Sequence, residues 1–215
     1  RASSILGFGA DFLMEVKGQE LPMHDPRGKV GVALGYALAP GGADHMQMAH
    51  DTLMTDPEGF GTKSVAPLGI LGPMDPLSLG REKISALMTL WTFWTFQNHL
   101  GGCHFVFAPR SAFPVEGIPL LVEAATGWKT SLWELMRMGQ RSLAAARILN
   151  RNLGFGPADD VLPKRLFEPI SSGPCEGRRT LEPETFENAL KTAWSILGWD
   201  EEGNPLPGTK AALGL

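Results

Sequence analysis

The residues of this chain that could carry chemistry are few, and the first is Cys103 in the stretch FQNHLGGCHFVF, residues 96–107. A thiolate at this place could act as a nucleophile or bind a metal, whereas a buried thiol would be a small apolar filler. One cysteine cannot hold an iron–sulfur cluster by itself, because such clusters are held by four thiolates. Cys175, the second of two cysteines, lies in a Gly/Pro-rich loop, and we interpret it as an incidental surface thiol.

Histidines supply the remaining candidates. His45 in GGADHMQ is either a metal ligand or a hydrogen-bonded packing residue, and Asp44 is placed to orient its ring. The stretch HDPRG, residues 24–28, is either a turn held by an Asp–backbone bond or a loop that lines a domain interface near a substrate channel. His99 and His104 flank Cys103, where they would pack, cap the preceding helix or hydrogen-bond toward a cluster.

Composition and motifs exclude several other functions. The net charge is −4 and the basic residues are scattered, which argues against a nucleic-acid partner. No run of about 18 apolar residues spans a membrane and no signal-peptide pattern is visible, so a reducing cytoplasm fits best. The sequence has no P-loop, dinucleotide-binding glycine motif, nucleophile elbow or zinc motif. It opens at Arg1 in the middle of a pattern, which suggests a fragment or a processed chain.

The elements that must position these residues are predicted to be helices. The clearest covers residues 80–99, where apolar residues recur at 3.6-residue spacing before the helix ends at Gly101 and Gly102. Phe93 and Phe96 widen its apolar stripe, which predicts burial on more than one side. Further helices are expected at 2–16, 30–38, 117–125, 131–152 with a capping box at Ser131, and from Pro183 onward.

The predicted fold is therefore mainly α and multihelical, with long ordered loops rich in proline and glycine. We expect a partial middle helical domain over 1–76, containing the DPRG loop, and a C-terminal helical domain over 77–215. The tryptophans are expected in the core, and Asp159 and Asp160 in a solvated turn.

Five stretches, in order along the chain, resemble the tungsten-containing aldehyde:ferredoxin oxidoreductases. Residues 16–47 are similar to that family's VKG-x-E-x-P-x-x-DPRG, G-x-x-LGYA and G-x-DH segments. Residues 90–103 stand where the family has a helix ending in D-x-x-G-L-C. Residues 120–155 are similar to its A-x-TGW and E-L-x-x-x-G-x-R segments. The fourth and fifth stretches are DDVLPKRLFEPI and the GWDE-x-G-x-P ending.

The resemblance implies the C-terminal part of an enzyme that oxidises aldehydes to carboxylic acids with ferredoxin as electron acceptor. It implies a tungstopterin or molybdopterin and a [4Fe–4S] cluster, with Cys103 as the fourth cluster ligand. The other three thiolates would come from N-terminal domains that also carry much of the pterin. It further implies that Asn98, Gly101 and Gly102 lie against the pterin, and that His45 binds a structural iron between two subunits of a homodimer.

The chain departs from the motif at two positions. Asn98 replaces the aspartate that hydrogen-bonds the pterin, so the charge is lost while an acceptor remains. Gly102 replaces the leucine beside the cluster. Two alternatives stay open: a superfamily relative such as the tungsten subunit of benzoyl-CoA reductase, and a cofactor-free helical module that holds partners. Isolated from its cofactor-binding partners, the chain is expected to be inactive.

Overall fold

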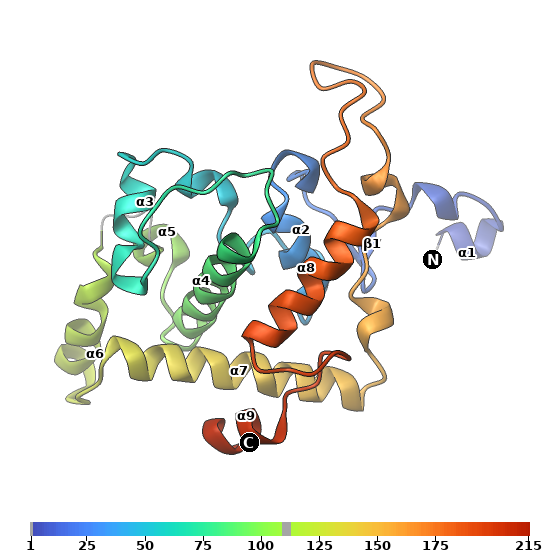
Figure 1. The fold of residues 1–215 in the computed structure, drawn as a ribbon. Coiled ribbons are helices and arrows are strands. Elements are labelled where there is room, and N and C mark those ends of the chain that lie inside the picture. Colours follow the sequence, from blue (N-terminus) through green and yellow to red (C-terminus); the bar gives the residue numbers. More distant parts are fainter. Residues whose placement is uncertain (1, 109–112) are drawn as a thin grey trace.

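The structure is a computed structural model that describes residues 2–108 and 113–215. It is mainly α, as the sequence predicts, and Figure 1 shows several helices packed over one long helix, with the N-terminal helix lying apart. The helices are α1 (Ala2–Leu6), α2 (Gly31–Leu38), α3 (Phe60–Ser64), α4 (Arg81–His99), α5 (His104–Phe107), α6 (Ile118–Thr126), α7 (Leu132–Asn152), α8 (Pro183–Ile196) and α9 (Pro207–Leu213).

The described part of the chain has one small sheet, in which β1 (Glu15–Val16) pairs antiparallel with β2 (Gln19–Glu20). Lys17 and Gly18 form the connecting turn with φ of 52° and 79°, and positive values at both positions are what a type I′ hairpin turn requires. Gly42 lies against this turn, because a Cβ there would be 2.1 Å from the carbonyl oxygen of Val16. No helix in the described ranges is long and apolar enough to cross a membrane.

Helix α4 is the centre of the fold and is buried on two faces. One face contributes Leu87 and Trp91 to a core shared with α2 and α8. The other contributes Phe93 and Phe96 to a second core shared with residues of the 49–70 region and with Ile118. The two-sided burial expected from the widened stripe is therefore observed. The first core draws on residues both before and after position 76, and the proposed division at that position stays a prediction.

Helix α7 runs beneath α4 and α8 in Figure 1, and α9 lies on its other side. Close contact between α4 and α7 depends on Gly139, because a Cβ there would be 2.3 Å from the carbonyl oxygen of Thr92. Ser131 caps α7 by accepting the backbone N–H of Glu134 at 3.2 Å. Arg137 and Arg141 donate to the carbonyls of Ala212 and Leu213, which fixes the C-terminal end.

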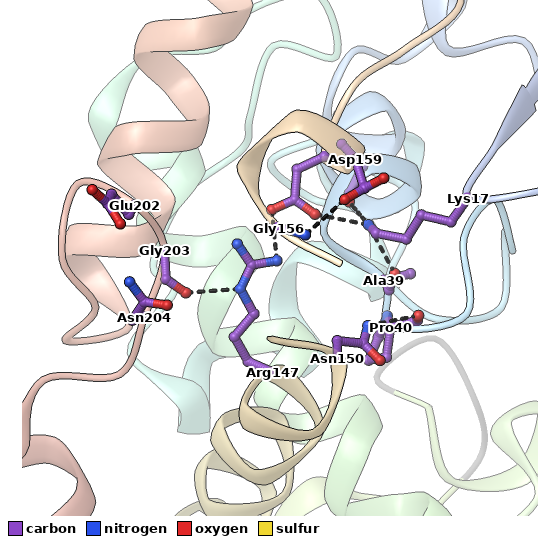
Figure 2. Close-up of polar contacts among 12 residues, drawn as sticks. Lys17, Ala39, Pro40, Arg147, Asn150, Gly156, Asp159, Glu202, Gly203 and Asn204 are labelled. Atoms are coloured by element: carbon purple, nitrogen blue, oxygen red, sulfur yellow. Dashed lines mark hydrogen bonds and ion pairs between the residues drawn. The ribbon is translucent and has the colours of Figure 1, made fainter. Parts of the chain in front are cut away.

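A buried ionic network joins segments that are far apart in the sequence. Asp160 is 0% exposed and pairs with Lys17 at 2.8 Å and with Arg147 at 2.7 Å. Arg147 also donates to the carbonyl of Gly203 at 2.7 Å, and Lys17 donates to the carbonyl of Ala39. Figure 2 shows Lys17 and Arg147 converging from the hairpin and from α7. Burial lowers the pKa of Lys17, although Asp160 opposes this shift.

Several local expectations are wrong. The helix predicted over 2–16 breaks after Leu6, because Gly7 and Gly9 adopt φ of 72° and 86° and the chain continues through a short 3-10 turn into β1. Trp128 and Trp133 are 59% and 71% exposed, so only part of the tryptophan set is core. Asp160 is buried, because two cations compensate its charge.

Candidate functional site

The Cys103 turn begins where α4 ends, and its path is set by backbone hydrogen bonds. Gly101 has φ of 66°, in the left-handed region. The N–H of Gly102 donates to the carbonyl of Gln97 at 3.0 Å, and that of Gly101 donates to Asn98 at 3.2 Å. These two bonds form the Schellman motif that ends many helices. The direction in which the chain enters Cys103 is therefore fixed by the local sequence.

Cys103 itself is exposed. Its backbone is extended, with φ −69° and ψ 124°, and its carbonyl accepts the first hydrogen bonds of α5. Phe105 and Val106, which follow it, are 70% and 46% exposed. The thiol is thus presented on an apolar surface and is not a buried filler. Cys175 is also free and exposed, as expected of a surface thiol.

Gln97 lies beneath this turn. Its residue is 1% exposed, and its Oε1 atom would be 2.7 Å from a Cβ placed on Gly102. The Nε2 atom of Gln97 is buried and has no hydrogen-bond acceptor in the described residues. Sequence analysis missed this residue, because a glutamine next to an asparagine at a helix end shows no pattern that indicates burial.

The histidines that flank Cys103 are both engaged. The Nε2 atom of His99 lies 2.5 Å from the hydroxyl of Ser142, which links the end of α4 to α7. The ring of His104 packs against that of Trp94, with centroids 5.3 Å apart. These contacts support the packing interpretation, and a hydrogen bond toward a cluster stays a prediction. Asn98, on the same turn, is exposed.

His45 lies in a cluster of three imidazoles that the sequence did not reveal. Its ring centroid is 4.5 Å from that of His24 and 6.0 Å from that of His50, and the latter two are 4.7 Å apart. The Nζ atom of Lys29 lies 2.9 Å from Nδ1 of both His24 and His50. Helix α2 separates His24 and Lys29 from His45 and His50 along the chain, so no local spacing brings all four together.

The hydrogen bonds of His24 and His50 indicate which of their ring nitrogens accept. The Lys29 ammonium can only donate, so Nδ1 of His24 and Nδ1 of His50 are acceptors. The Nε2 atom of His50 lies 3.0 Å from the carbonyl of His45 and therefore carries the proton. Burial lowers the pKa of His50 to about 4. The hydrogen bond to the His45 carbonyl opposes this shift, and the charge of Lys29 adds to it. His50 is neutral near pH 7.

The described residues do not contain a set of three or more His, Cys, Asp or Glu side chains arranged for a metal. Lys29 occupies the space between two of the imidazoles, where a second cation would be repelled. A metal at His45 would therefore need ligands from outside the described residues.

The HDPRG stretch forms the turn that one interpretation predicts. The Asp25 carboxylate accepts the backbone N–H of Arg27 at 2.9 Å and pairs with its guanidinium at 2.7 Å. The hydroxyl of Tyr36 donates to the carbonyl of His24 at 2.8 Å, and Thr180 donates to the carbonyl of Arg27 at 2.7 Å. The turn is thus tied both to α2 and to the segment before α8, while its role at a domain interface stays a prediction.

The role of Cys103 as one ligand among several stays a prediction. The turn offers an exposed thiol on a backbone held by hydrogen bonds. Beneath it, the Nε2 atom of Gln97 is a buried donor that has no acceptor in the described part of the chain. A single thiolate is one quarter of the ligand set that an iron–sulfur cluster needs. The other ligands would have to come from elsewhere.

Comparison with known proteins identifies the family of this chain. The family model described as "Aldehyde ferredoxin oxidoreductase, domains 2 & 3" matches residues 1–215. The chain belongs to the aldehyde ferredoxin oxidoreductase family. It is 31% identical over 197 residues to the tungsten-containing aldehyde ferredoxin oxidoreductase of Pyrococcus abyssi, covering 91% of this chain and 29% of that protein. It is 32% identical over 203 residues to the enzyme of Thermococcus kodakarensis, covering 94% of this chain and 30% of that protein.

A solved structure shares the fold. The active site complex BamBC of benzoyl coenzyme A reductase, in complex with 1,5-dienoyl-CoA, matches with a TM-score of 0.64 and 16% sequence identity. The match covers 100% of this chain and 35% of that one. At this identity it supports the helical architecture alone. The chain spans about 30% of the length of these curated relatives.

Proposed function

We propose that this chain is the C-terminal helical portion of an oxidoreductase that converts an aldehyde and water to a carboxylate, three protons and two electrons. Membership of the family and relatives of 31–32% identity that are described as tungsten-containing support this proposal. The single observation that carries it is the match of the family model to residues 1–215. The exposed Cys103 thiol, on a turn fixed by backbone hydrogen bonds, is available as a ligand. A thiol that served only to fill the core would be buried.

In this proposal the residues of the chain bind and orient. Cys103 supplies the fourth thiolate of a [4Fe–4S] cluster, and N-terminal domains supply the other three together with most of the pterin contacts. Asn98, Gly101 and Gly102 lie against the pterin, where Asn98 offers an amide in place of a carboxylate. The tungsten or molybdenum pterin, when bound, supplies the oxygen-atom chemistry. Ferredoxin accepts the electrons, and the enzyme is cytoplasmic.

His45 is proposed to bind a metal at an interface with a second copy in a homodimer. It cannot complete such a site alone, because Lys29 engages both neighbouring imidazoles. The proposal therefore requires ligands from outside the described residues.

The deciding experiment is metal analysis of the full-length polypeptide, produced without oxygen, as wild type and as Cys103→Ser. We expect tungsten or molybdenum and about four irons per wild-type chain. Cys103→Ser should lose most of the iron and the cluster's EPR signal while retaining the pterin metal. Cys175→Ser is the matched control, because Cys175 is also free and exposed but lies in another loop. Full iron retention in Cys103→Ser would contradict the proposal.

The same preparation separates the alternatives. Oxidation of simple aldehydes with reduction of ferredoxin supports the proposed reaction, whereas activity only toward aromatic CoA thioesters would indicate a relative of benzoyl-CoA reductase. A well-folded full-length protein with neither iron nor tungsten nor molybdenum would indicate a cofactor-free interaction module.

A further inference from the structure

The N-terminal segment, residues 2–13, exposes a run of large apolar side chains. No residue of this segment is buried by another part of the described chain. Single exposed apolar residues are ordinary on protein surfaces, but a dense run of them marks a contact surface. The members of the run are Ile5 at 73% exposure, Leu6 at 60%, Phe8 at 70%, Phe12 at 72% and Leu13 at 44%.

The segment has little stability of its own. Helix α1 has five residues, and Gly7 ends it by donating its N–H to the carbonyl of Ser3 at 2.9 Å. Isolated helices shorter than about 12–15 residues are marginal in water, because few hydrogen bonds offset the cost of starting the helix. In Figure 1, α1 lies apart from the other helices. Packing against another surface is what would hold it.

The C-terminal end of the segment is anchored to the helical body. The ring of Phe12 lies 5.8 Å from the guanidinium carbon of Arg165. Met14, which follows the segment, packs against the first core, and Val16 is 2% exposed. The segment therefore leaves the body at a fixed place beside the β1–β2 hairpin, and its apolar run lies beyond that anchor.

We propose that the apolar run of residues 5–13 is a docking surface for the part of the full-length protein that precedes this chain. This inference rests on the proposed function, in which the chain is a C-terminal portion. The family model is described as covering domains 2 and 3, and the chain covers 29% and 30% of two relatives, so the family's proteins contain a further domain. The partner is an apolar patch on that domain.

Charge and connectivity favour this occupant over the two others that an apolar run could contact. Residues 2–13 contain one charged side chain, that of Asp11, and no lysine or arginine. Helices that bind anionic lipid surfaces are rich in both cations, so a membrane is disfavoured. A domain joined through the backbone is present at a high effective concentration, which a second copy would have to match.

The first test identifies the occupant by photo-crosslinking in the full-length polypeptide. Phe8 is replaced by p-benzoyl-L-phenylalanine, and the crosslinks formed on irradiation are mapped by mass spectrometry. We expect a crosslink within one chain to residues that precede the 215 residues described here. The same probe at Leu71, which is 85% exposed in another loop, is the control and should not reach those residues. A crosslink between two chains, or none at position 8, would overturn the proposal.

The second test compares hydrogen exchange in two proteins, the full-length polypeptide and the 215-residue chain. The amides of residues 3–13 should exchange at least tenfold more slowly in the full-length protein. Leu6→Ser/Phe8→Ser should remove most of that protection and leave exchange in the 215-residue chain unchanged. Asp11→Asn is the control, because it lies in the same segment but removes no apolar surface. Equal exchange in the two wild-type proteins would refute the docking surface.

The same double variant tests the other occupants. Binding of the 215-residue chain to phosphatidylcholine–phosphatidylserine vesicles that is lost in Leu6→Ser/Phe8→Ser would assign the run to a lipid surface. A dimer of the 215-residue chain that this variant dissolves, measured by sedimentation, would assign it to a second copy. Either result would overturn the proposal.

Failure of the docking surface and failure of the proposed function are distinguishable. A full-length protein without iron, tungsten or molybdenum overturns the redox assignment, but the crosslink at position 8 needs no cofactor and still decides the occupant. A metal-loaded enzyme in which position 8 forms no crosslink leaves the proposed function standing and removes only the docking surface.

Discussion

Replacing Asp160 by asparagine tests the buried network that joins the hairpin to α7. Asp160 is fully buried and its carboxylate pairs with Lys17 at 2.8 Å and Arg147 at 2.7 Å. Both cations are also almost inaccessible, with side-chain exposures of 2% and 4%. Asparagine has nearly the same shape but no charge, so the substitution would leave two buried cations without a counter-charge.

The expected cost can be worked from this geometry. Removing one partner of a buried ion pair costs about 3–5 kcal/mol, because the remaining charge is stranded in a poorly solvating interior. Asp160→Asn should therefore reduce the free energy of unfolding by about 4 kcal/mol, out of a total of roughly 5–15 kcal/mol for a folded domain. Lys17→Met should cost less, because Asp160 then keeps its contact with Arg147.

The assay is equilibrium unfolding of the 215-residue chain in urea at pH 7, followed by circular dichroism and tryptophan fluorescence. With a slope of about 2–3 kcal/mol per molar urea, Asp160→Asn should lower the midpoint by roughly 1.5 M. The double variant Asp160→Asn/Lys17→Met should be more stable than Asp160→Asn, since one stranded cation is removed. Glu187→Gln is the control: its pair with Lys191 is exposed, so the midpoint should not move.

A loss below about 1 kcal/mol for Asp160→Asn would refute the reasoning, because it would mean that water or other groups solvate the two cations as well as the carboxylate does. A double variant that is less stable than Asp160→Asn would likewise contradict the charge-balance argument.

Three further substitutions test the packing that positions the site, each by the change in urea midpoint or melting temperature. Gly139→Ala should destabilise the folded chain by about 1–3 kcal/mol, because its Cβ would be 2.3 Å from the carbonyl oxygen of Thr92. Gly208→Ala is the control and should be near neutral. Equal effects of the two substitutions would mean that α4 and α7 separate freely. Trp91→Ala should cost about 3–5 kcal/mol because the residue is 1% exposed. Trp133→Ala should cost far less and should mainly remove a solvent-quenchable part of the fluorescence, since Trp133 is 71% exposed; a loss as large as that of Trp91→Ala would contradict the exposures.

Local sequence determined the longer helices and the candidate ligand. The 3.6-residue spacing of α4, its end at two glycines and the start of α8 at Pro183 depend on contacts three or four residues apart, which a reader of the sequence can count. The position of Cys103 just after a helix could be predicted for the same reason, because the hydrogen bonds of the Schellman motif link only residues 97–102. Ordered motifs along the chain identified the family, since they do not depend on knowing the contacts.

Tertiary structure alone decided which polar groups are buried and what they meet. Asp160 was expected in solvent because carboxylates usually are, yet it pairs with Lys17, which is far away in the sequence. The cluster of three imidazoles around Lys29 likewise arises from how separate segments of the chain fold back on one another. Burial of a charge or an amide depends on compensation by distant partners, and no local periodicity encodes those partners.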